Sequence, residues 1–174
     1  MKLPLPLTTE RILIREFRVE DRNSYYELMS EKDIQKYLGS PITREKANEQ
    51  LQQVINQYQQ SGLGPLALWE LGADKVIGFC GFIKDQSEEG IGIIYGILPQ
   101  FRRKGYGVEA VTKLISEAFK NCEFDRIIAR VDSENVASIN LLKKVGMKYF
   151  KDTKNLWHDK KDNLFVIEKP YKHT

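Results

Sequence analysis

The chain has 174 residues, of which 41% are hydrophobic and 29% charged, with a formal net charge of +3. This length suits one well-cored domain, and so small a charge does not by itself predict nucleic-acid binding. No apolar run approaches the roughly 18 residues of a membrane span, and the opening MKLPLPL is expected to be too short for a signal peptide. Cys80 and Cys122 lie far apart and are predicted to be free, buried thiols, so we expect a cytoplasmic protein.

The first half of the chain predicts one strand, two helices and a hairpin. Residues 11–17 alternate apolar and charged side chains, as a half-buried strand does. Residues 21–29 and 43–62 are predicted helices, the second beginning at a threonine suited to capping. The short apolar segments 65–71 and 76–83 flank the turn-like GADK and predict a hairpin.

The second half alternates strands and helices. Its first strand contains Gly96, which indicates either a β-bulge or a close backbone approach. The pattern predicts an α/β fold of the α+β type: one domain over residues 1–174, with a mixed sheet covered by helices. The elements expected here are strands at 90–98, 126–132, 147–153 and 164–169, and helices at 105–121 and 135–145.

The segment QFRRKGYGVEA lies between a predicted strand and a predicted helix. Gly105 and Gly107 let the backbone curl tightly against a ligand, and the first N–H groups of the helix favour an anion. Arg102, Arg103 and Lys104 add positive charge at the same place. Together these features predict a pyrophosphate site, although a glycine turn with a solvated basic edge is the simpler alternative.

A dinucleotide-binding fingerprint is the rival interpretation. Gly105, Gly107 and Ala110 fit its spacing, and Asp132 ends a later strand. Against it, the first glycine follows Leu98 too distantly, and the preceding antiparallel half leaves no room for a second mononucleotide unit. A dehydrogenase is therefore the more distant alternative.

At these residues the chain resembles the GNAT superfamily of N-acetyltransferases, whose signature R/Q-x-x-G-x-G/A lies at a strand-to-helix junction. Arg102, Gly105 and Gly107 match that signature. Downstream, ENVASINLLKKVGM is similar to the family's N-x-x-S/A…K-x-G-F segment. The matching residues there are Asn135, Ser138, Lys144 and Gly146, with Met147 where phenylalanine is usual.

The segments LTTERILIREF, YLGSPIT and IGFCGF resemble the RimJ/RimL-type branch, which acetylates protein N-termini among other amines. The resemblance covers about residues 7–168. It implies a six- or seven-stranded mixed sheet whose two parallel central strands, 90–98 and 126–132, splay apart. It also implies acetyl-CoA as co-substrate, with no metal.

The family's pose implies that pantetheine pairs with the backbone near Ile97 and Leu98, while the pyrophosphate meets the N–H groups of residues 103–108. Asn135 would contact pantetheine or merely cap its helix, and Lys143 or Lys144 would approach the nucleotide or remain solvated. The residues expected to bind the cofactor are Ile97, Leu98, Arg102, Arg103, Lys104, Gly105, Tyr106, Gly107, Val108, Asn135 and Ser138.

The resemblance also implies which positions would supply the general acid and the general base. Leu142 stands where many members carry an acidic tyrosine, so Ser138 is the candidate general acid, a surface serine being the alternative. Gly92 stands where members often carry a basic carboxylate, and Tyr95 is either a core residue or a functional one. The general base therefore stays unassigned. Two further pairs of residues are considered: Glu88 and Glu89, in a segment typical of a solvated turn, and Trp157 and His158, in a predicted loop that could line an acceptor site.

The expected reaction is acetyl transfer from acetyl-CoA to a primary amine, with a protein or peptide N-terminus as the first choice of acceptor. A polyamine, antibiotic or metabolite amine is the alternative acceptor, and a CoA-binding module without turnover is the alternative function. Neither a nucleic-acid nor a membrane partner is expected.

Overall fold

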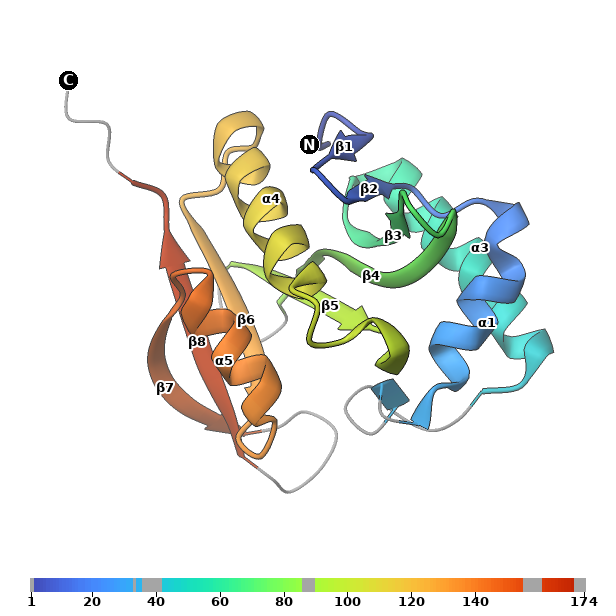
Figure 1. Cartoon of the computed structure of the whole chain (residues 1–174). Coiled ribbons are helices and arrows are strands. Elements are labelled where there is room, and N and C mark those ends of the chain that lie inside the picture. Colours follow the sequence, from blue (N-terminus) through green and yellow to red (C-terminus); the bar gives the residue numbers. More distant parts are fainter. Residues whose placement is uncertain (1, 33, 36–41, 86–89, 155–160, 171–174) are drawn as a thin grey trace.

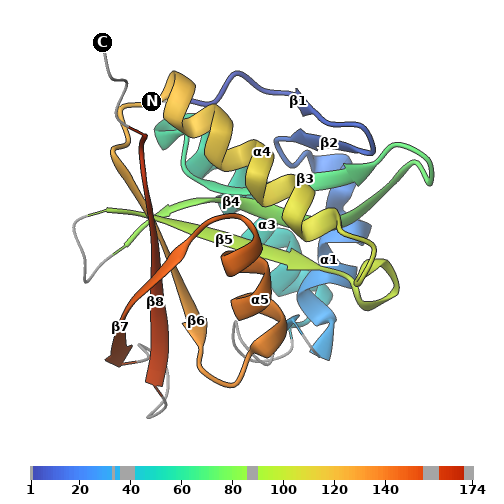
Figure 2. The same cartoon turned by 60° about the vertical axis from the view of Figure 1, so that its left-hand side comes forward.

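The computed structural model of the chain describes residues 2–32, 34–35, 42–85, 90–154 and 161–170. Within these ranges one mixed sheet carries eight strands in the order β1-β2-β3-β4-β5-β6-β8-β7. Helices cover both of its faces (Figures 1 and 2). The strands are β1 Leu7–Thr8, β2 Ile12–Arg15, β3 Gly64–Glu70, β4 Lys75–Lys84, β5 Ile91–Ile97, β6 Arg126–Asp132, β7 Lys148–Lys154 and β8 Lys161–Glu168.

The expected α/β fold with one mixed sheet is confirmed, and the short β1 makes the sheet one strand wider than the seven foreseen. Thr43 accepts a hydrogen bond from the Lys46 amide and begins α3, while Gly62 ends it with a left-handed φ of 72°. The helical elements are η1 Val19–Asp21, α1 Arg22–Ser30, α3 Arg44–Ser61, η2 Pro99–Phe101, α4 Tyr106–Asn121 and α5 Val136–Lys144.

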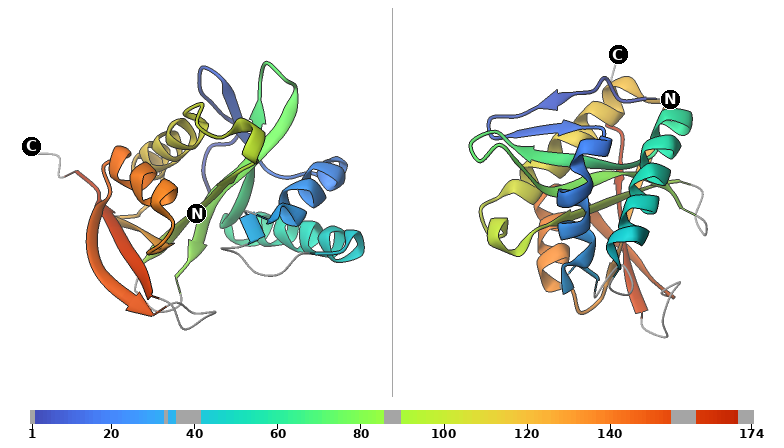
Figure 3. Two further views of the ribbon diagram at one scale, coloured as in Figure 1. Left: turned by 60° about the horizontal axis from the view of Figure 1, so that its bottom comes forward. Right: turned by 90° about the vertical axis from the view of Figure 1, so that its right-hand side faces the viewer.

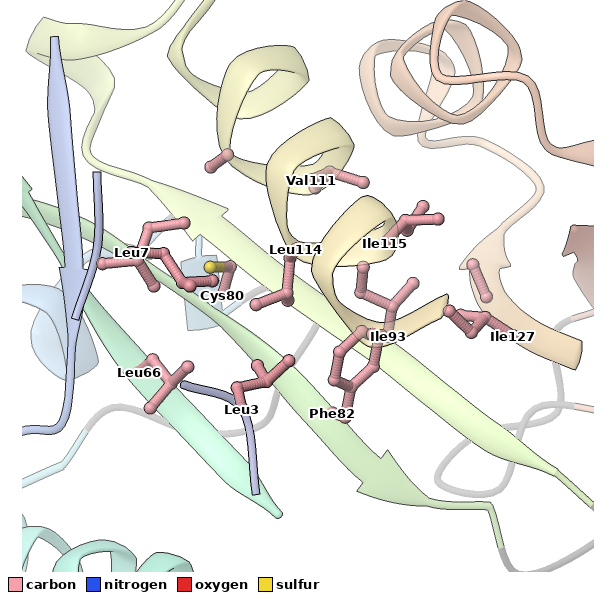
Figure 4. Packing of buried hydrophobic residues seen from close by; sticks show 14 of the residues in the cluster. Leu3, Leu7, Leu66, Cys80, Phe82, Ile93, Val111, Leu114, Ile115 and Ile127 are labelled. Carbon is pink, nitrogen blue, oxygen red and sulfur yellow. The ribbon is translucent and has the colours of Figure 1, made fainter. Parts of the chain in front are cut away.

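Two hydrophobic clusters join the helices to the sheet. Helices α4 and α5 pack on one face, and α1 and α3 pack on the other (Figure 3). Leu114 of α4 points at the strands, among side chains that include Cys80 and Ile93 (Figure 4). Both cysteines are free and buried, as predicted. No helix in the described ranges is long and apolar enough to cross a membrane.

Gly96 marks a close approach rather than a bulge. Strands β4 and β5 pair without a register shift, and Gly96 lies opposite Phe79. A Cβ atom on Gly96 would lie 2.6 Å from Cε1 of the Phe79 ring, which is closer than van der Waals contact allows. The ring therefore requires glycine at this point of β5, and the bulge interpretation is wrong.

Strands β5 and β6 are parallel but stay together only briefly. Their pairing consists of Ile91 with Ile127 and Gly92 with Ile128, at the start of both strands. Beyond these pairs the strands diverge (Figure 1). The splayed central pair implied by the family resemblance is thus present, and it leaves the second half of β5 without a neighbour on one side.

The contact at Gly96 predicts that Gly96→Ala destabilises the fold. The added methyl must displace the buried Phe79 ring, so we expect a loss of about 1–3 kcal/mol in the free energy of unfolding. Urea titration measures this loss. Gly90→Ala is the matched control, because its Cβ would meet nothing nearer than Ile128 at 3.9 Å. Equal stabilities for the two variants would show that Phe79 does not constrain β5.

Candidate active site

A cleft of about 1080 Å³ adjoins the splayed part of the sheet. Its walls come from the end of β5, the η2 turn, the loop before α4, the first turn of α4 and one side of α5. The cleft brings together residues from both family-like motifs, which lie apart in the sequence. Of the residues expected to bind the cofactor, all line it except Leu98 and Lys104.

The N-terminus of α4 opens into this cleft. Gly105 is its N-cap and, having no side chain, makes no capping hydrogen bond, whereas Thr43 and Asn135 cap α3 and α5. The first intrahelical bond runs from the Glu109 amide to the Gly105 carbonyl, so the preceding N–H groups have no helical partner. These N–H groups and the helix dipole form a site suited to a phosphate.

The loop before α4 curls because two of its residues are left-handed. Gly105 has a φ of 86° and Arg103 has a φ of 61°, which is uncommon for a residue with a Cβ. The carbonyl of Lys104 accepts a hydrogen bond of 2.9 Å from Arg11 Nη1. Arg11, which directly precedes β2 and is far away in the sequence, therefore helps to hold the loop in its curled form.

Gly107 serves helix packing. A Cβ atom on Gly107 would lie 2.7 Å from Cδ1 of Leu141 on α5, and 3.8 Å from Ile97. A side chain here would require the end of Leu141 to move. The second glycine of the motif thus leaves room for Leu141 of α5, in addition to the ligand contact expected of it.

The cations of the loop differ in their surroundings. Arg102 Nε donates to the Ile97 carbonyl at 2.9 Å and braces the turn after β5. Lys104, which is expected to bind the cofactor, does not line the cleft, and its Nζ lies 5.3 Å from the centroid of the Phe101 ring. Arg103 lines the cleft, as does Lys144, whereas Lys143 does not.

The backbone at the end of β5 explains why Ile97 and Leu98 differ. The Leu98 amide donates to the Ile77 carbonyl at 2.9 Å, and its carbonyl accepts from the Phe101 amide. Because backbone groups alternate along an antiparallel strand, Ile97 and Tyr95 direct theirs away from β4, toward the splayed side. Leu98, where a cofactor contact is expected, is turned away from the splayed side: both of its backbone groups are bonded within the chain and its side chain is 1% exposed.

The start of α5 places a pair of hydroxyl groups in the cleft. Asn135 Oδ1 accepts from the Ser138 amide at 3.1 Å, so the capping role weighed for Asn135 is present. Ser138 Oγ lies 2.6 Å from the hydroxyl of Tyr95, and both residues line the cleft. Burial raises the pKa of Tyr95 to about 12, although the bond to Ser138 opposes this. Tyr95 is therefore a neutral phenol at physiological pH.

The tyrosine and the carboxylate that the family often uses as acid and base have no counterpart among the described residues of this wall at the positions considered. Leu142, at the position of the family's tyrosine, is 0% exposed and belongs to the core. Among the described residues that line the cleft there is no aspartate or glutamate. The other residues weighed for the site, Glu88, Glu89, Trp157 and His158, lie outside the described residues.

The side chains of Thr9, Arg11 and Glu109 form a hydrogen-bonded cluster that could not be predicted from the sequence. This cluster, called the buttress below, supports the loop before α4. Glu109 accepts hydrogen bonds from Thr9 Oγ1 at 2.6 Å and from Arg11 Nε at 2.8 Å. Arg11 also stacks on Tyr106, 4.6 Å from the ring centroid. Burial favours the protonated form of Glu109, but hydrogen bonds from Thr9 and Arg11 outweigh it and lower the pKa of its carboxyl.

The fold excludes the dinucleotide-binding alternative. Most neighbouring strands are antiparallel, and β5 and β6 share only two residue pairs, so the described residues form no doubly wound parallel sheet. A splayed sheet beside an uncapped helix N-terminus and several cations is instead an arrangement suited to a long anionic ligand.

Comparison with known proteins identifies the family. Residues 11–148 match the family model described as the acetyltransferase (GNAT) domain, and the chain belongs to this family. It is 30% identical to the uncharacterized N-acetyltransferase YnaD of Bacillus subtilis over 82% of each chain. The chain is therefore an acetyl-CoA-dependent N-acetyltransferase.

Solved structures share the fold. An acetyltransferase of the GNAT family from Bacillus anthracis is 24% identical and superposes with a TM-score of 0.83, over 95% of this chain and 99% of that one. RimL, described as a ribosomal L7/L12 alpha-N-protein acetyltransferase in complex with coenzyme A, is 14% identical with a TM-score of 0.80. That comparison covers 93% of this chain and 96% of RimL.

The buttress predicts a coupled effect of Glu109→Gln. Losing the carboxylate loosens Arg11 and the loop, so the KM for acetyl-CoA should rise roughly three- to tenfold, or about 1 kcal/mol of binding. The folded pKa of Glu109 lies below its unfolded value of about 4.3, so its contribution to stability is present above that pH and is lost on acidification. The variant should lack this part of the pH dependence of unfolding.

Steady-state kinetics and urea titrations between acid and neutral pH measure the two effects. Glu117→Gln is the matched control, an acid-to-amide change on the same helix at a residue paired with Lys113. It should leave the KM unchanged. A Glu109→Gln variant with the wild-type KM would show that the loop keeps its shape without the buttress.

Proposed function

We propose that the enzyme acetylates the N-terminal α-amine of a peptide or protein, with Ser138 as the donor to the leaving sulfur. The observation that carries the choice of acceptor is the lack of acidic groups in the cleft: its described lining includes no carboxylate that could deprotonate a strongly basic amine. An acceptor that is already partly neutral at physiological pH suits such a cleft.

The acidity of the amines makes this argument quantitative. An α-amine has a pKa near 7.7–8.0 and a lysine amine one of about 10.4, so the neutral fraction differs by roughly several hundredfold at neutral pH. A lysine or polyamine acceptor would require a strong base or an acidic pocket to make up that difference. An α-amine requires only water or a weak base.

The apolar part of the cleft lining supports the same choice. Ile34, Pro99 and Phe101 give the cleft an apolar wall beside the cationic loop. Such a wall suits a neutral amine and the side chain of a terminal residue, and it disfavours a polycation that stays charged along its length. The description of RimL as an alpha-N-protein acetyltransferase adds support from a protein of the same fold.

The acceptor proposal predicts where a peptide with one free N-terminus and one internal lysine is modified. Incubated with enzyme and acetyl-CoA at neutral pH, it should be acetylated at the α-amine, and fragmentation mass spectrometry locates the group. The rate should rise with pH until the α-amine is deprotonated, near pH 8.

The same peptide with a formylated N-terminus is the control and should react slowly or not at all. Spermidine at the same concentration tests the small-molecule alternative. Modification mainly at the lysine, or faster transfer to spermidine, would contradict the proposal and require a base outside the described cleft wall.

A further inference from the structure

The hydroxyl groups of Tyr95 and Ser138 meet across two elements that are far apart in the sequence. Tyr95 lies on β5, on the face covered by α5, and Ser138 lies in the first turn of α5. Their oxygens are 2.6 Å apart, a short O–H···O distance, while the Ser138 carbonyl is 3.5 Å from the Tyr95 hydroxyl. The strong bond of Tyr95 in this arrangement is therefore the one to the serine hydroxyl.

The direction of that bond follows from the chemistry of the two groups. A phenol is a stronger hydrogen-bond donor than an alkyl alcohol, and an alkyl alcohol is the better acceptor. If Tyr95 donates, the hydrogen of Ser138 is left to point into the cleft. If Ser138 donated instead, no hydrogen on the serine would remain for a ligand.

We propose that Tyr95 is a positioning residue that donates its hydrogen to Ser138 Oγ and so directs the serine hydrogen at the sulfur of the departing CoA. The inference rests on the proposed role of Ser138. It gives Tyr95, which the sequence left as either core or functional, a place in the reaction.

Neither hydroxyl group has to ionise during acetyl transfer. The amine nitrogen attacks the thioester carbon, the C–S bond breaks, and its electron pair goes to the sulfur. Ser138 donates a hydrogen bond to that developing thiolate, and the bond from Tyr95 strengthens the serine as a donor. A thiolate with a pKa near 8.5 does not remove a proton from either hydroxyl at equilibrium, so its final proton comes from the amine or from water.

A double-mutant cycle tests the coupling. Tyr95→Phe removes one hydroxyl and keeps the ring, so we expect kcat to fall roughly five- to tenfold while the KM for acetyl-CoA changes less than about twofold. Ser138→Ala should lower kcat by at least the same factor. In the Ser138→Ala background, Tyr95→Phe should cost nothing further, because Tyr95 acts through the serine.

The assay follows CoA release with whichever amine the wild type acetylates fastest, so it stays readable if the α-amine proposal fails. Tyr25→Phe is the control, a buried tyrosine on α1 outside the cleft wall whose pKa is likewise about 12. It should retain wild-type kcat. An equal loss from Tyr95→Phe in both backgrounds, or no loss in either, would overturn the proposal.

A second measurement needs no turnover. The ultraviolet absorbance of the thiolate gives the pKa of the thiol of bound CoA, with desulfo-CoA as the blank for tyrosine ionisation. A donor aimed at the sulfur lowers this pKa, so Tyr95→Phe and Ser138→Ala should each raise it by a similar amount. An unchanged thiol pKa in Tyr95→Phe would show that the tyrosine does not direct the serine at the sulfur.

Discussion

Strand β5 loses its neighbour after two residue pairs, and the cleft exists because of that loss. Backbone N–H and C=O groups inside a sheet are normally paired, and unpaired ones are costly when buried. Here Tyr95 and Ile97 direct theirs toward the splayed side, where the Ile97 carbonyl is bound by Arg102. An extended ligand with amide groups can occupy the place of the missing strand, as the family's pantetheine does.

The surrounding elements hold this opening in shape. Phe79 presses on Gly96 from one face of β5, while Leu141 meets Gly107 where α4 approaches α5. Arg11 pulls the loop before α4 toward the N-terminal strands. The cleft thus combines a helix N-terminus suited to an anion, a strand whose last backbone groups face the opening and a pair of hydroxyl groups. We propose that these hold the phosphates, the pantetheine arm and the thioester of acetyl-CoA.

Much of the fold could be predicted from local patterns. The alternation in 11–17, the threonine that begins α3 and the glycine turn before α4 are short-range signals, and all three elements formed as expected. The orientation of the Leu98 backbone toward β4 could not be predicted, because the direction of a backbone group depends on strand register, which the sequence does not display. The Tyr95–Ser138 and Arg11–Glu109 contacts join residues 43 and 98 positions apart, so only the folded chain reveals them.

Amide hydrogen exchange with and without acetyl-CoA tests whether the cofactor fills the place of the missing strand. We expect the cofactor to slow exchange in peptides covering the end of β5 and residues 103–108, and to leave β3, which is already paired on both sides, unchanged. Binding that protects neither the end of β5 nor the α4 N-terminus would contradict it.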